Sequence, residues 1–185
     1  MNDSASIIEP SASPISWDAI TARTKVYVAS TRLQQSADQA EALEAVQDIT
    51  ANLLGSEEFA LYKLDSTGKS LWLYWSCGID PNKHSVLEIS SHPKLAEALA
   101  GNAILRDANS GREKLLLDDD SVNGIVPILS NGAAVGALVI FRVLPHKGKF
   151  DSSDREICKV LSNCAGRAIE PKREQQSSIC EREGT

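Results

Sequence analysis

Cysteine is the side chain in this sequence best suited to nucleophilic or redox chemistry. The four cysteines, Cys77, Cys158, Cys164 and Cys180, are widely spaced and form no C-x-x-C pair. The spacing therefore indicates neither a zinc site nor a disulfide framework. Cys77 is the best placed of them, because it ends an apolar run beside Gly78. Redox cycling needs a second thiol within reach, and we expect none near Cys77. We therefore expect Cys77 to be a small core residue.

Histidines and acids between residues 78 and 121 could bind a ligand or a metal. His84 or His92 could act as a base or as a haem ligand, but neither has a second identifiable ligand nearby. Asp118–Asp120 could offer oxygens to a cation, yet three consecutive acids point at one ion only if the chain turns sharply. Solvated loop residues are the favoured interpretation of both groups, and we predict no metal site.

Aromatic residues crowd one predicted strand, "SLWLYWSC" at residues 70–77. Alternation along a strand predicts two faces. One would carry Leu71, Leu73, Trp75 and Cys77, and the other Trp72, Tyr74 and Ser76. One face fills a core, and an aromatic residue on the other could stack on a planar ligand.

The elements that position these residues follow from periodicity and turn signals. Apolar stripes and end signals predict helices over 17–35, 36–55, 92–101 and 150–170, with capping boxes at Ser36/Gln39 and Ser153/Glu156. Strands are expected over 58–64, 70–77 and 103–107, and in a hairpin over 124–144.

The hairpin is the clearest local signal. Asn131-Gly132 between two apolar runs is typical of a type I′ turn, which requires positive φ at both residues. The second run is apolar or small at nearly every position, so both faces of that strand should be covered by protein. Gly136 within it marks a close approach of another backbone or of a ligand. Pro127 and the turn argue against a membrane span.

Composition bounds the remaining possibilities. The chain has 185 residues, a net charge of −6 and no cluster of Lys and Arg, which disfavours a nucleic-acid partner. No secretory signal is visible, so we expect a cytoplasmic protein. Residues 1–14 and 171–185 are predicted to be disordered arms, with a helix over 15–35 and one domain over 36–170. The fold class is α+β, with an antiparallel sheet, terminal helices on one face, and an excursion from Gly78 to Ser121 on the other.

Four segments in order resemble the GAF domains, a family of small sensory modules. They are "LWLYWSCG", "HPKLAEALAGNAILRD", "VPILSNGAAVGALVI" with Gly136 and Leu138, and "FDSSDREICKVLSNCAGRAI". The resemblance implies a small-molecule pocket between the sheet and the excursion. It also implies Trp75 on the helix side of the sheet and Trp72 or Tyr74 on the pocket side. Polar groups for such a pocket could come from Ser76, His84, His92, Arg106 and Asn123, with Gly136 as a further contact.

The resemblance does not fix one chemistry. The cyclic-nucleotide signature of some members is not recognisable, and the excursion has no cysteine for a covalent bilin. Methionine sulfoxide reductases with this fold carry paired loop cysteines, which this chain lacks. We therefore expect a non-enzymatic sensory module that binds a small molecule of unknown identity and signals through a protein partner. The alternative is a ligand-free interaction or dimerisation module.

A homodimer is the last expectation from the sequence. The helix over 17–35 has no other obvious role, and Ile20, Tyr27 and Leu33 would stay partly exposed on it in a monomer. The competing interpretation is that this helix folds back and completes the core of its own chain.

Overall fold

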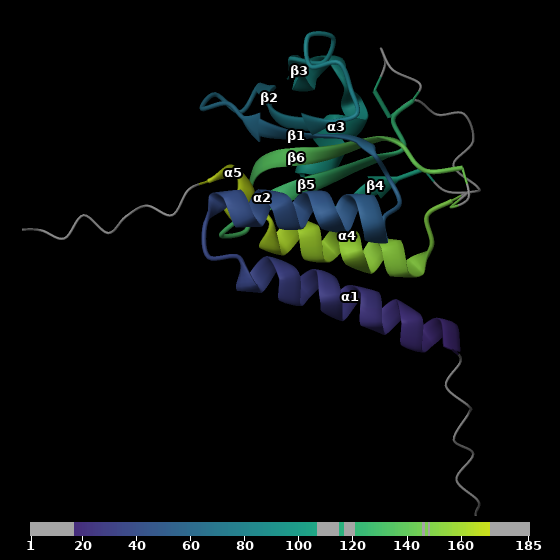
Figure 1. Cartoon of the computed structure of the whole chain (residues 1–185). Coiled ribbons are helices and arrows are strands. Elements are labelled where there is room, and N and C mark those ends of the chain that lie inside the picture. The colour runs from purple at the N-terminus through teal and green to yellow at the C-terminus, as the bar shows by residue number, and fades with distance from the viewer. Residues whose placement is uncertain (1–16, 107–114, 117–120, 146, 148, 171–185) are drawn as a thin grey trace, which may run out of the picture.

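The structure is a computed structural model that describes residues 17–106, 115–116, 121–145, 147 and 149–170. The predicted disordered arms, Asp118–Asp120 and Cys180 lie outside these residues. Figure 1 shows a curved sheet with a helical layer on one face and the excursion on the other. This is the α+β architecture expected from the sequence.

Within the described residues the sheet has six strands, and every neighbouring pair is antiparallel. The spatial order is β3 (Val86–Glu88), β2 (Ser70–Cys77), β1 (Glu58–Leu64), β6 (Ala133–Arg142), β5 (Gly124–Ser130) and β4 (Ile104–Leu105). The five predicted strands are confirmed. The sequence analysis missed β3, because a three-residue strand is too short to show an alternating pattern.

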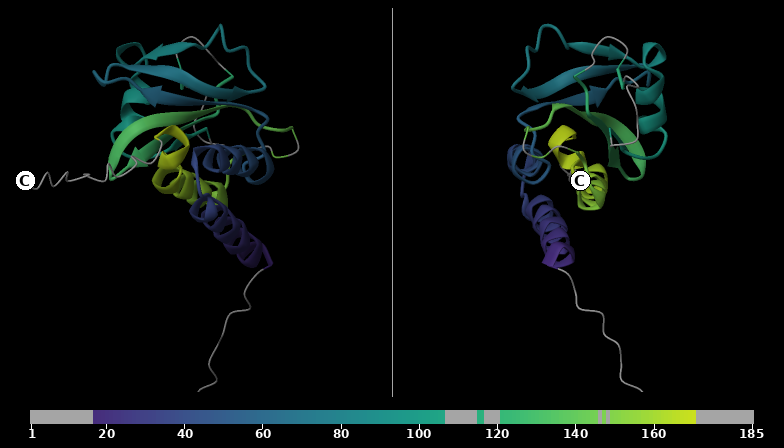
Figure 2. Two further views of the ribbon diagram at one scale, coloured as in Figure 1. Left: turned by 60° about the vertical axis from the view of Figure 1, so that its left-hand side comes forward. Right: turned by 90° about the vertical axis from the view of Figure 1, so that its right-hand side faces the viewer.

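The helices form two layers on one side of the sheet. The inner layer contains α2 (Gln39–Asp48), its π-helical continuation η1 (Ile49–Leu53), α4 (Ser152–Cys164) and α5 (Gly166–Ile169). The helix α1 (Trp17–Gln35) packs on α4 and α2 and forms the outermost layer (Figure 1). On the opposite face lie the short helices η2 (Ile89–Ser91) and α3 (Pro93–Leu99), as the turned views in Figure 2 also show.

Aspartates, and not the predicted serines, cap the two inner helices. The Asp38 carboxylate accepts the Glu41 N–H at 2.9 Å, whereas the Ser36 hydroxyl donates back to Leu33 O at 2.9 Å and closes the end of α1. At α4, Asp151 accepts the Asp154 N–H at 2.9 Å, and Asp154 accepts the Asp151 N–H at 2.8 Å. Partial burial raises the pKa of Asp151, but hydrogen bonds from Ser153 and two backbone N–H groups outweigh it and hold that pKa below its usual value.

The sheet separates two apolar cores. The helix-side core contains Phe59, Leu61, Leu138 and Ile140 from the central strands, packed against α2 and α4. The excursion-side core contains the intervening residues of the same strands, joined by Leu95 and Leu116. The central strands are thus buried on both faces, as the continuous apolar run after Asn131-Gly132 predicts.

The hairpin geometry is also as predicted. Asn131 and Gly132 have φ of 52° and 80°, the two positive values of a type I′ turn. A side chain at Gly136 would place its Cβ 2.1 Å from Tyr62 O of β1 and 2.6 Å from Ile169 Cδ1 of α5. Gly136 is therefore required by a close backbone approach on the helix side, and the structure gives it no role toward the excursion.

We predict that Gly136→Val lowers the free energy of unfolding by about 3 kcal/mol, because the clash is with backbone that cannot move aside. The matched control is Ala133→Val, at an exposed position of the same strand, which should change stability little. Urea unfolding of both variants measures the difference. Equal, small effects would contradict the assigned contact.

A buried ion pair joins the end of η1 to the start of α4. Lys147 Nζ lies 2.7 Å from Asp154 Oδ1 and donates to Leu53 O at 3.0 Å. The Asp154 side chain is fully buried, and that of Lys147 is nearly so. The ammonium group therefore satisfies a helix-terminal carbonyl and a buried carboxylate together.

Lys147→Met should destabilise the protein by about 3 kcal/mol, because it leaves the Asp154 carboxylate buried without its cation. Lys159→Met is the control, since Lys159 pairs with Glu156 on the exposed surface of α4 and its loss should matter little. Thermal unfolding of the two variants side by side tests this. A Lys147→Met protein as stable as the control would show that the pair contributes nothing net.

Candidate functional site

A β-bulge in β2 decides which of its aromatic residues face the excursion. The register between β1 and β2 shifts between Leu61, which pairs with Trp75, and Tyr62, which pairs with Leu73. Tyr74 is the extra residue of the bulge. As a result Leu71 and Leu73 belong to the excursion-side core, while Trp75 and Cys77 pack against the helix-side core.

The bulge confirms one prediction for this strand and overturns another. Trp75 lies on the helix side as expected, with its ring centroid 5.6 Å from that of Phe59. The expectation that Trp72 or Tyr74 faces the excursion is wrong. The Tyr74 hydroxyl accepts a hydrogen bond from Gln39 of α2 at 2.8 Å. Trp72 pairs with Lys63, and Lys63 faces the helix side because it lies two residues after Leu61 in β1. Trp72 therefore also faces the helix side, where it is 57% exposed.

Three of the predicted polar residues converge on the excursion face. The His84 ring lies 4.8 Å from that of Phe141 of β6, and the His84 carbonyl accepts the Tyr62 hydroxyl at 3.0 Å. The side-chain amide of Asn123 donates to Phe141 O at 2.5 Å. The backbone carbonyl of Asn123 accepts the backbone N–H of Arg106 at 2.8 Å. Contacts therefore run without a break from β1, through the excursion, to the residue that follows β4.

Two further predicted polar residues, Ser76 and His92, lie on the same face. Ser76 pairs with Ala60 of the excursion-side core, and directly paired residues share a face of the sheet. His92 is buried, and its carbonyl accepts the N–H groups of Leu95 and Ala96 in the first turn of α3. Its position is thus explained by the start of the helix.

Side chains of the chain itself occupy much of the space between sheet and excursion. Tyr62, Leu71, Leu95, Leu116 and Phe141 are all buried there. A ligand at this site would contact the rim formed by His84, Arg106 and Asn123, or would enter as some of these apolar side chains move.

The structure also contains a large open hollow that the sequence analysis did not predict. Its volume is about 1000 Å³, and it lies on the helix side of the sheet, around the β5–β6 turn. Leu33 of α1, Lys63 of β1, Val135 of β6 and Arg167 of α5 are among its lining residues, and none of the eight predicted site residues is. Four separate segments of the described chain line it, near residues 33–34, 63, 129–135 and 163–170, so no local pattern could have revealed it.

The cysteines of the described residues lie away from the excursion face. Cys77 packs against the helix-side core, and Cys164 lines the open hollow. Cys158 is buried in α4, where burial and, to a lesser extent, the nearby Asp154 carboxylate raise the pKa of its thiol to about 12. At neutral pH this thiol is therefore protonated and unreactive.

The described part of the chain shows neither a metal cluster nor a membrane span. It contains no group of three or more His, Cys, Asp or Glu side chains placed to hold a metal ion. None of its helices combines the length and apolar character needed to cross a bilayer.

Comparison with solved structures identifies the architecture. The GAF domain of a phosphoenolpyruvate-protein phosphotransferase from Coxiella burnetii superposes with a TM-score of 0.61 at 17% identity, covering 82% of this chain and 94% of that chain. Residues 122 to 287 of a methyl-accepting chemotaxis protein match with a TM-score of 0.53 at 20% identity, covering 79% and 96%.

An enzyme is also among the similar structures. The free methionine-R-sulfoxide reductase from Neisseria meningitidis, solved with its substrate, has a TM-score of 0.56 at 16% identity and covers 83% of this chain and 93% of that chain. No protein-family model and no curated protein matches the sequence. The chain has a GAF-like fold, as its four sequence segments indicated.

Cys77 allows a direct test of sulfoxide reduction. Its place against the helix-side core predicts that Cys77→Ser will not change the rate at which the chain consumes free methionine-R-sulfoxide with dithiothreitol as reductant. Both proteins should stay at the rate of the reagent alone, measured by amino-acid chromatography. Turnover by the unmodified chain that disappears in Cys77→Ser would instead assign the residue a catalytic role.

Proposed function

We propose that this chain is a non-enzymatic regulatory module of the GAF type. It binds a small molecule on the excursion face of the sheet and passes that event to a protein partner. The observation that carries the proposal is the set of contacts that links His84, Asn123 and the backbone of Arg106, from three separate segments, to the aromatic residues Tyr62 and Phe141. A few polar groups set among apolar and aromatic walls are what small-molecule sites in proteins require.

The surroundings of this cluster support the same assignment. The chain is acidic, which disfavours a nucleic-acid ligand, and the aromatic floor suits an uncharged or planar molecule better than a bare ion. His84 holds the excursion to β1 through its carbonyl and to β6 through its ring. A ligand that displaced either contact would free the excursion at that point, and the binding event would then be visible to a partner.

A second function is favoured by a different observation. The buried side chains of Tyr62, Leu71, Leu95, Leu116 and Phe141 fill much of the excursion-side core without any ligand. A module of this kind would act only as an interaction or dimerisation domain, and the excursion would serve as a fixed cover for the sheet.

Native mass spectrometry separates the two functions. The full chain is purified from its own host without denaturation, and the intact mass is compared with that of the denatured chain. We expect an additional mass from a small molecule bound to the unmodified protein. Arg106→Met should lose this mass, because the variant removes a cation from the rim while keeping the length of the side chain.

Trp72→Ala is the matched control, since Trp72 is a large exposed residue on the opposite face of the sheet. It should retain the bound mass. Loss of the mass from both variants would place the ligand elsewhere. An unmodified chain that carries no additional mass from its host would favour the ligand-free function.

A further inference from the structure

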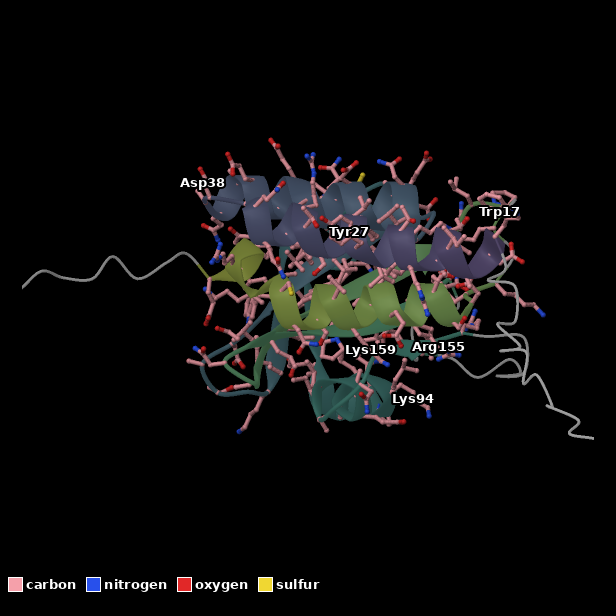
Figure 3. The ribbon with its side chains drawn as sticks, turned by 90° about the horizontal axis from the view of Figure 1, so that it is seen from below. Trp17, Tyr27, Asp38, Lys94, Arg155 and Lys159 are labelled. Atoms are coloured by element: carbon pink, nitrogen blue, oxygen red, sulfur yellow. The ribbon has the colours of Figure 1, made fainter. Side chains whose placement is uncertain are left out.

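The open hollow on the helix side of the sheet lies where the helical layer stops. α1 and α4 both end beside it, at Gln35 and Cys164, and α5 and the β5–β6 turn form its other walls. Figure 3 views the helical layer from the side that faces away from the sheet, with α5 at the end of the layer where α1 and α4 stop. Lys63 pairs with strands on both sides, through Trp72 and Gly136, and is still exposed. The helices of the described residues therefore leave this part of the sheet uncovered.

The end of α1 contributes a buried residue to the hollow. Leu33 lines the hollow and belongs to the helix-side core. This corrects the expectation that Leu33 stays exposed, and it confirms that α1 folds onto its own chain. Ile20 and Tyr27 are exposed, as expected. The wall that α1 forms is therefore part of the core of the domain.

The lining of the hollow divides into an apolar floor and a polar rim. The floor contains Leu33, Leu129, Val135 and Cys164, which are buried or half-buried. The exposed lining residues form the rim, and all of them are polar or charged: Gln34, Lys63, Asn131, Asn163, Arg167 and Glu170. An apolar centre surrounded by a polar rim is the usual arrangement of a protein–protein interface.

The rim is more cationic than the chain as a whole. It carries Lys63 and Arg167 against one carboxylate, that of Glu170, in a chain with a net charge of −6. Arg167 donates to Ser36 O at 3.0 Å, which holds its guanidinium group at the junction of α1 and α2. Neither cation forms an ion pair with another described residue. Both charges are thus available to a carboxylate from outside the chain.

Trp72 extends the apolar surface beside the rim. It pairs directly with Lys63, so the two side chains lie next to each other on the same face of the sheet. Exposed tryptophan and arginine side chains are among those that contribute most to binding energy at interfaces. The hollow therefore has residues of both kinds at its edge, Trp72 from β2 and Arg167 from α5.

The dimensions of the hollow favour a partner segment over a small molecule. Its volume of about 1000 Å³ is at the upper end for small-molecule sites, which enclose most of the surface of their ligand. The rim residues are exposed here, so a small molecule would stay in contact with water. A side chain that enters as part of a larger partner is covered by the partner itself.

We propose that the hollow docks an acidic segment of a protein partner. An apolar side chain of the segment enters the floor, and carboxylates on either side of it bind Lys63 and Arg167. The proposal names the class of partner for the proposed regulatory module, and it rests on that function only in requiring a protein partner. It holds equally for a module that binds no small molecule.

β1 connects this surface to the ligand site. The Tyr62 hydroxyl donates to the His84 carbonyl on the excursion side at 3.0 Å, and the next residue, Lys63, lines the hollow. Successive residues of a strand point to opposite faces of the sheet. A ligand that displaces β1 at Tyr62 therefore also displaces Lys63, where the partner binds.

Nuclear magnetic resonance of the full chain tests the docking. The probes are short capped peptides of the form Glu-Glu-X-Glu-Glu, in which X is Leu, Met, Phe or Trp, and the same peptides with Lys in place of Glu. We expect an acidic peptide to shift the backbone amide signals of Ser130, Asn131 and Arg167, with a dissociation constant below about 1 mM. The basic peptides should leave these signals unchanged.

Charge reversal tests the role of the rim. Lys63→Glu should raise the dissociation constant of the acidic peptide at least about tenfold and keep its melting temperature, because Lys63 is exposed. Lys63→Arg keeps the charge and should retain the affinity. Lys159→Glu is the matched control, since Lys159 is an exposed lysine of α4 that does not line the hollow (Figure 3). It should bind the peptide as the unmodified chain does.

The outcomes distinguish the docked segment from other occupants. The proposal is overturned if no acidic peptide shifts the signals at the hollow, or if Lys63→Glu and Lys159→Glu weaken binding equally. The same shifts with glutarate alone, at the same concentration, would overturn it in favour of a small anion. Shifts that appear on concentrating the protein without peptide would overturn it in favour of a second copy. The small molecule of the ligand site is detected by its mass, so a failure here is distinct from a failure there.

Discussion

Burial of the central strands on both faces is the constraint on which this fold depends. β1 and β6 carry apolar residues toward the helices and toward the excursion, so neither face can remain open to water. The terminal helices cover one face because their single apolar stripes match it. The other face must be covered by the chain between β2 and β5, whose described residues form only short elements. The sheet is therefore stable only when the excursion covers its second face.

The bulge at Tyr74 has consequences on both sides of the sheet. Without it, strict alternation would put Trp75 and Cys77 on the same face as Leu71 and Leu73. The extra residue turns Trp75 onto Phe59 and leaves Leu71 and Leu73 to the excursion-side core. It also directs the Tyr74 hydroxyl to Gln39, so one irregularity fills two cores and forms a contact to α2.

The sequence predicts those features that local chemistry determines. Asn131-Gly132 has no good alternative to a type I′ turn, and the stripe of α4 fits only a helix against an apolar surface. The helix starts were misplaced because Ser36 and Ser153 are acceptable caps until Asp38 and Asp151 are seen to compete for the same backbone N–H groups. A bulge, a three-residue strand and a hollow lined by four segments depend on tertiary pairing, which a single sequence does not display.

The site residues were predicted better from their polar chemistry than from their expected positions along the strands. His84, Arg106 and Asn123 were selected as the few polar residues available to the excursion face, and the structure brings these three together. Trp72 or Tyr74 was assigned to the excursion face from the resemblance to GAF domains and on the assumption of strict alternation, which one inserted residue breaks. The sequence correctly predicted that another group approaches Gly136 closely. Only the structure shows that this group is Tyr62 O, together with Ile169 of α5.

The junction between α1 and α2 connects the outermost helix to the sheet. Gln39 at the start of α2 donates to the Tyr74 hydroxyl of β2 and to Ala168 O at 3.3 Å. Arg167 of α5 donates to Ser36 O at 3.0 Å, in the turn that ends α1. Because β2 also carries Leu71 and Leu73 of the excursion-side core, a displacement of that core has a short route of direct contacts to the end of α1. The bulged strand and the end of α1 are thus held by neighbouring hydrogen bonds to the adjacent helices α2 and α5.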